Sequence, residues 1–230
     1  MSLNSYYIRA RLFPTILTVI PLLIFFNKIV ATFYYDTLKE ILGVLPLITN
    51  ISLSTALLFL MVQINRLVAK EIFQRFYFED EIKMPTTNHL LWSSVFFENS
   101  IKTKIRSKIN AKYELILMNP EEENAQEQNA RKQICIAVSQ IRNSLRDNKL
   151  LLQHNIEYGF FRNLLGGCLI ALIFSLCILI YGFTMGELGF KITGIVLSII
   201  YLIPILFSNP IIKRFGNYYS KILYEQFLSI

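Results

Sequence analysis

Long apolar runs alternate with polar stretches along this chain, and the runs form two pairs. Each run is close to the ~20 residues that a helix needs to cross ~30 Å of hydrocarbon. The pattern therefore predicts an all-α integral membrane protein with four transmembrane helices and a helical cytosolic insertion between spans two and three. The predicted spans are 12–35, 41–64, 163–185 and 192–212.

The polar stretch between the two pairs predicts two charged helices. Isoleucines recur every four residues within 100–118, which indicates one amphipathic helix. Asn119-Pro120 followed by three glutamates is typical of a helix start, because the cap, the proline and the acids all suit the first turn. The apolar spacing that follows extends this second helix to about Leu152. We expect the two helices to form a hairpin.

This order of segments predicts four parts. Residues 1–64 form a first transmembrane hairpin, and 65–162 form a cytosolic helical domain. Residues 163–212 form a second transmembrane hairpin, and 213–230 form a cytosolic amphipathic tail.

Charge orients these parts across the membrane. The chain is 53% apolar with a net charge of +7, and its lysines and arginines gather on one side of the predicted spans. The two short connections within the hairpins contain only two basic residues, Lys39 and Lys191. By the positive-inside rule, both termini and residues 65–162 are expected in the cytoplasm.

Basic residues line faces of both charged helices and are candidates for contact with an anionic ligand. The alternative is an ordinary solvated or lipid-facing surface. The candidate residues are Lys104, Lys108, Lys112, Arg131, Arg142, Arg146 and Lys149.

A polar cluster at the middle of the second span is the candidate pore lining. Thr49, Asn50 and Ser54 belong to it, and Asn50 and Ser54 lie four residues apart on one helix face. Polar groups at this depth face water or a bundle interior rather than lipid. The alternative is that they hydrogen-bond neighbouring helices.

The stretch 145–167 leads from the polar region into the third span and is the candidate gating junction, with Tyr158, Gly159 and Arg162 at its centre. The tyrosine is expected at the lipid headgroups. Gly166 and Gly167 are expected to admit a neighbouring helix at close range. The alternative is an ordinary interfacial anchor.

No enzyme motif is present, and no predicted span contains Asp or Glu, which disfavours a proton-coupled transporter. The three cysteines lack metal-ligand spacing. We therefore expect neither enzymatic activity, nor a bound metal, nor a cofactor.

Three short motifs carry a family resemblance. They are Tyr7-x-Arg9-x-Arg11-Leu12-x-Pro14, Pro85-Thr86-Thr87-x-x-Leu90, and Arg146-Asp147-x-Lys149 leading to Asn155-x-x-Tyr158-Gly159-Phe160-x-Arg162-Asn163-Leu164-x-Gly166. With these motifs the chain resembles bacterial four-span proteins, such as Hailong-type transmembrane effectors, from antiphage defence operons that also encode a nucleotidyltransferase.

The resemblance implies a multi-pass protein of the bacterial inner membrane, in contact with membrane lipid. It implies a homo-oligomeric ion channel, for which we favour a tetramer, controlled by a nucleotide or short oligonucleotide from the partner nucleotidyltransferase. The rival hypothesis is a non-conducting anchor or scaffold whose cytosolic hairpin docks a partner protein. A small-molecule transporter ranks third.

Overall fold

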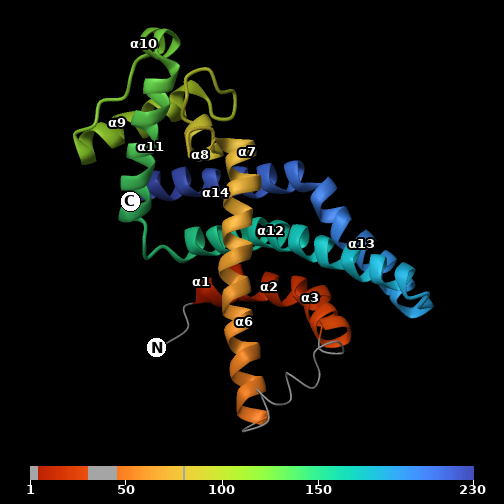
Figure 1. The fold of residues 1–230 in the computed structure, drawn as a ribbon. Coiled ribbons are helices and arrows are strands. Elements are labelled where there is room, and N and C mark those ends of the chain that lie inside the picture. The colour runs from red at the N-terminus through yellow and green to blue at the C-terminus, as the bar shows by residue number, and fades with distance from the viewer. Residues whose placement is uncertain (1–4, 31–45, 80) are drawn as a thin grey trace. The chain divides into compact units, whose positions relative to one another are not determined.

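The computed structural model describes residues 5–30, 46–79 and 81–230, with side chains from residue 55 onward in the second range. Every regular element in this part of the chain is a helix (Figure 1), as predicted. The described residues belong to two compact units. Unit 1 comprises residues up to 73 together with 160–208, and unit 2 comprises 74–159 together with 209–230.

Unit 1 contains the apolar helices. Two of its helices are long and apolar enough to cross a membrane, and a bent pair of shorter helices becomes a third if it counts as one span. Residues 41–45 of the predicted second span lie outside the described residues. The elements are α1 (Ser5–Tyr7), the π-helical turn η1 (Ile8–Leu12), α2 (Phe13–Thr18), α3 (Ile20–Phe25), the π-helical turn η2 (Phe26–Val30), α6 (Pro46–Val68), most of α12 (Lys149–Thr184) and α13 (Leu188–Leu206).

Proline causes the bend in the first apolar segment. The helical axis turns by 41° between Thr18 and Ile20, next to Pro21, which has no N–H to donate to the carbonyl of Leu17 four residues earlier. The Tyr201 hydroxyl, from α13, donates to that Leu17 carbonyl at 2.8 Å. A side chain of another helix therefore replaces the hydrogen bond that proline removes.

The glycine pair brings α12 against α6, as predicted. A Cβ placed on Gly166 would lie 2.4 Å from the Asn65 carbonyl oxygen, and one on Gly167 would lie 2.3 Å from the Thr18 hydroxyl. The Asn65 amide nitrogen donates to the hydroxyls of Thr15 at 3.1 Å and Thr18 at 3.2 Å. Three helices thus meet at one buried polar contact.

Unit 2 is built around one apolar core that the two charged helices share with the C-terminal helix. The π-helical turn η3 (Ala69–Gln74) leads into this unit. In Figure 1 the two charged helices α9 and α11 are green and the C-terminal helix α14 is blue. Its elements are α7 (Arg75–Phe78), α8 (Pro85–Asn88), α9 (Asn99–Tyr113), α10 (Pro120–Ala125), α11 (Glu127–Ser144), the start of α12, and α14 (Ser208–Ser229).

The predicted start of the second charged helix is confirmed. The Asn119 side chain accepts from the Glu122 N–H at 2.9 Å, and the Glu122 carboxylate accepts from the Asn119 N–H at 3.0 Å, which is a capping box. Its predicted continuation as one helix to Leu152 is wrong, because α10 ends at Ala125 and α11 begins only after Gln126, which is not helical. Helix α11 ends at Ser144, and the Asn148 side chain caps the next helix by accepting from the Leu151 N–H at 2.9 Å.

The C-terminal segment also differs from its prediction. The fourth apolar helix ends at Leu206 instead of residue 212, four residues before Pro210, whose ring cannot continue the hydrogen-bond ladder. The predicted amphipathic tail is part of α14 and is built into the core of unit 2. Leu223, Tyr224 and Phe227 are all fully buried there.

Candidate functional site

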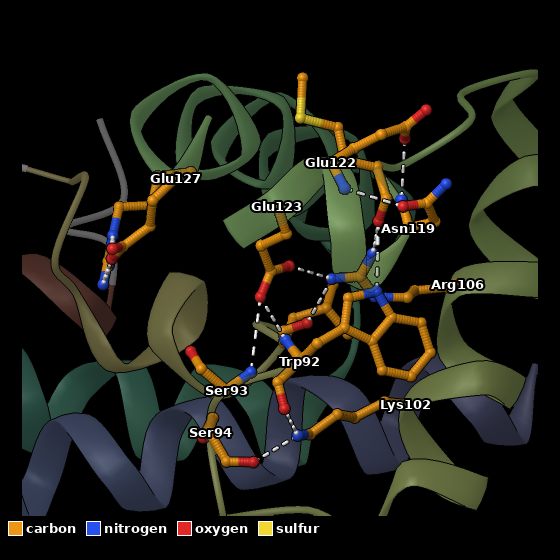
Figure 2. Close-up of polar contacts among 12 residues, drawn as sticks. Trp92, Ser93, Ser94, Lys102, Arg106, Asn119, Glu122, Glu123 and Glu127 are labelled. Carbon is orange, nitrogen blue, oxygen red and sulfur yellow. Dashed lines mark hydrogen bonds and ion pairs between the residues drawn. The ribbon is translucent and has the colours of Figure 1, made fainter. Parts of the chain in front are cut away.

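Two cations and one anion are buried together in unit 2, and we call Lys102, Arg106 and Glu123 the charged brace. Arg106 donates from Nη2 to Glu123 Oε2 at 2.9 Å and from Nη1 to the Met118 carbonyl at 2.7 Å. Its guanidinium lies 4.5 Å from the centre of the Trp92 ring. Figure 2 shows these side chains converging on the loop that carries Trp92.

The brace holds the loop 92–98 through its main chain. Glu123 Oε1 accepts from the Trp92 N–H at 2.6 Å and from the Ser93 N–H at 3.4 Å. Lys102 donates to the carbonyls of Trp92, at 3.0 Å, and Ser94 (Figure 2). Because backbone groups inside a protein need partners, the three charges fix the path of a loop that has no regular structure of its own.

Burial shifts the proton affinity of these groups. It lowers the pKa of the Lys102 ammonium, and the neighbouring Arg106 lowers it further, while Glu123 opposes both. Burial also lowers the pKa of Arg106, and Glu123 again opposes the shift. The carboxylate therefore favours the charged form of both cations, since an unpaired buried charge is costly.

Two predicted ligand contacts are engaged inside the protein. Arg131 donates to the Ile82 carbonyl at 3.2 Å and to the Asn88 side chain, and it pairs with Glu127 at 2.7 Å. Arg142 reaches the Glu81 carboxylate and the Thr86 hydroxyl, each at 3.5 Å. Both arginines fix the segment 81–91, which contains the second motif of the family resemblance, onto α11.

A third predicted contact, Lys108, closes the end of another helix. It donates to the Leu228 carbonyl at 3.2 Å, and its ammonium lies 5.5 Å from the centre of the Phe227 ring. A cation is favoured at this position because the last carbonyls of a helix carry partial negative charge. Lys108 therefore stabilises the attachment of α14 to α9.

Four predicted contacts are exposed on unit 2: Lys104 and Lys112 on α9, and Arg146 and Lys149 beyond the end of α11. Arg142 lies on a different helix from Lys149, because the turn at 145–148 interrupts the single helix that was predicted to carry both. The structure keeps the exposed cations in two groups, one on α9 and one at the start of α12.

The candidate gating junction lies where α12 passes between the units. Tyr158 is only 5% exposed, and its ring stacks on Tyr219 at 6.5 Å between centroids, so the ring packs within unit 2. Its predicted depth at the lipid headgroups stays a prediction. Gly159 is buried and helical, and Arg162 is half-buried. The candidate pore residues Thr49, Asn50 and Ser54 belong to α6, but their side chains lie outside the described residues.

The brace was missed at the sequence level, although a signal for it exists. Lys102, Ile105, Arg106 and Ile109 follow the spacing of a single buried helix face, and all four are buried. Neither buried cation is among the basic candidates predicted on this helix, which are Lys104, Lys108 and Lys112. Nothing in the run of three glutamates distinguishes Glu123, which is 2% exposed, from its exposed neighbours.

Among the described residues, no group of three or more His, Cys, Asp or Glu side chains could hold a metal ion. Comparison with protein-family models, with curated proteins and with solved structures yields no match to this chain.

Proposed function

We propose that the chain is an ion-conducting membrane effector of antiphage defence, gated by a nucleotide or oligonucleotide that binds unit 2. One observation carries the proposal. Helix α12 is a continuous helix of 36 residues, about 54 Å long at 1.5 Å per residue, and its residues 149–159 belong to unit 2 whereas the rest belong to unit 1. Binding at its polar end can therefore act on the membrane part through a helix that is continuous along the chain.

The exposed cations support an anionic ligand. Lys149 begins α12 and Arg146 lies three residues before it, so an anion held there contacts the end of the continuous helix itself. Lys104 and Lys112 extend the basic surface on α9. Arg131, Arg142 and Lys108 drop out of the ligand set in this proposal, because each is engaged in holding unit 2 together.

Four spans in one chain leave little room for a hydrated pore, so conduction requires several copies around an axis. We favour a tetramer with α6 as the lining helix, on the basis of its polar residues.

The test is ion flux into liposomes that contain the purified protein, with and without short oligonucleotides and cyclic nucleotides. We expect flux only with ligand. The double variant Arg146→Gln/Lys149→Gln should weaken binding and make the slope of log K against log salt shallower by about 1.4, at about 0.7 per phosphate on a single strand. Lys132→Gln, an exposed cation on α11 outside the candidate set, should leave the slope unchanged. No flux with any ligand would refute the channel proposal.

The proposal includes an orientation, with both termini and unit 2 in the cytoplasm of a bacterium. Lys and Arg placement supports it. A cysteine at exposed Glu187, between α12 and α13, should react with an impermeant thiol reagent added to intact cells after the outer membrane is permeabilised. One at exposed Asn124 should react only after the inner membrane is lysed. Labelling of Asn124→Cys in intact spheroplasts would show the opposite orientation and refute the proposed one.

A scaffold is the second candidate, and the loop 92–98 favours it. Val95 is 99% exposed and Phe96 is 41% exposed, on a loop that the charged brace holds in place. The Phe96 ring also stacks on His89 at 3.5 Å. An apolar tip held this firmly suits a pocket on a partner protein, because little freedom is lost on binding. If the protein is a scaffold, the liposomes should show no ion flux under any condition. The variant Val95→Ser should then lose binding of the partner protein.

A further inference from the structure

Helix α14 follows the last membrane helix almost directly. Helix α13 ends at Leu206 and α14 begins at Ser208. At 1.5 Å per residue, Lys213 lies about 10 Å along the chain from the end of α13. This distance along the chain is comparable with the Debye length at physiological salt, so charges here would be within electrostatic reach of headgroups at the end of α13.

One face of α14 is already occupied. Leu223, Tyr224 and Phe227 are fully buried in the core of unit 2, and the Tyr224 hydroxyl donates to the Thr86 carbonyl. The Asn148 amide also donates to Gln226 at 2.7 Å. Amphipathic helices at membrane surfaces insert an apolar face between the lipids, and the face formed by Leu223, Tyr224 and Phe227 is not available for insertion.

The outward face at the start of α14 is basic and aromatic. Lys213 and Arg214 are exposed, and the Arg214 guanidinium lies 5.8 Å from the centre of the Tyr218 ring, which is 44% exposed. Lys221 is also exposed but pairs with Glu225 at 3.8 Å. The unneutralised charge therefore concentrates in the first turns, nearest to the membrane helix.

We propose that Lys213 and Arg214, with Tyr218 beside them, form a binding surface for the headgroups of anionic phospholipids. The apolar face of α14 anchors the helix in unit 2, and its basic face holds the lipid. Binding is then electrostatic, without insertion of side chains into the hydrocarbon. One helix in this way joins unit 2 to the charge of the inner leaflet, independently of any ligand at Arg146 and Lys149.

The size of the effect follows from general membrane electrostatics. Each Lys or Arg near an anionic surface contributes about fivefold in affinity, and two contribute about 30-fold. Because no apolar surface is buried, the contribution must fall as salt rises.

The experiment measures the apparent Kd for phosphatidylglycerol added to the full-length protein in a neutral detergent, by native mass spectrometry, with phosphatidylcholine as the comparison lipid. We expect selective binding of phosphatidylglycerol, weakened about 30-fold in Lys213→Gln/Arg214→Gln. The matched control is Lys83→Gln/Lys132→Gln, which removes the same charge from two exposed positions of unit 2 outside both binding surfaces and should change this Kd little. A parallel wild-type titration at raised salt should also weaken binding.

Equal affinity for both lipids, or an equal loss in the control variant, would overturn the proposal, because the charge would then act without regard to position. Loss of oligonucleotide binding in Lys213→Gln/Arg214→Gln with unchanged phosphatidylglycerol binding would overturn it as well, and would assign this face to the signal ligand. Unchanged phosphatidylglycerol binding in the double variant, with folding confirmed by circular dichroism, is a third refutation. None of these results decides whether the protein conducts ions, so the two proposals fail separately.

Discussion

Replacing Glu123 with glutamine tests the charged brace most directly. The substitution removes one negative charge and keeps nearly the same shape. Lys102 and Arg106, which are 0% and 8% exposed, would then lie in the core with carbonyl oxygens and without a counter-charge. A glutamine can still accept from the Trp92 N–H, but its amide group would face the Arg106 guanidinium that the carboxylate contacts at 2.9 Å.

Removing one partner of a buried ion pair costs about 3–5 kcal/mol. We expect the lower end, about 3 kcal/mol, because one hydrogen-bond acceptor is kept. Glu121→Gln is the matched control. Glu121 is exposed in the first turn of α10, where a lost charge costs about 0.3–1 kcal/mol through the helix dipole.

The single tryptophan provides the assay. Trp92 lies within the brace, so its fluorescence during denaturant titration in detergent reports the unfolding of this region. If Glu123→Gln and Glu121→Gln have free energies of unfolding within about 1 kcal/mol of each other, the carboxylate does not hold the two cations and the account of the brace is wrong.

Three further predictions concern packing, the proline repair and pH. Gly166→Ala should destabilise the protein by about 1–3 kcal/mol through overpacking, whereas Gly189→Ala, with nothing within 4 Å of its new Cβ, should not, as measured by thermal unfolding in detergent. Tyr201→Phe should cost about 0.6–1.7 kcal/mol by removing the donor to the Leu17 carbonyl, and equal melting of the two proteins would count against that role. Burial lowers the pKa of His89 from 6.5 to about 4, so the neutral ring stabilises unit 2 above pH 6.5, and this stability is lost as pH falls from 6.5 to 4. His89→Gln should flatten the pH dependence of Trp92-detected unfolding over that interval.

Most of the helices could be predicted from hydrophobic periodicity and from the residues at helix ends. The span at α12 and the capping box at Asn119 were predictable because each rests on local chemistry, a long apolar run in one case and a cap with its acids in the other. The break after Ser144 also has a local signal, since Asn148 is a favoured cap residue. The apolar spacing continues across this break and favours an unbroken helix.

The partners of the buried faces were not predictable in the same way. The apolar face of α14 has the same periodicity whether lipid or a protein core covers it, so the sequence gives no means of choosing. The basic residues raise the same difficulty. Arg131 and Arg142 resemble exposed cations by spacing, and only the position of segment 81–91 shows that their charges are used internally.

The contact between Tyr201 and Leu17 has a consequence for how the apolar helices find their alignment. In hydrocarbon, apolar surfaces gain no hydrophobic free energy by exchanging lipid contacts for contacts with each other. Two apolar helices can therefore slide along each other with little change in energy. Pro21 leaves a specific carbonyl without its helical donor, and the tyrosine hydroxyl of α13 reaches that carbonyl at 2.8 Å. A shift of either helix by one turn would separate the two by about 5 Å. The proline and the tyrosine together therefore fix the position of α13 along the first apolar segment.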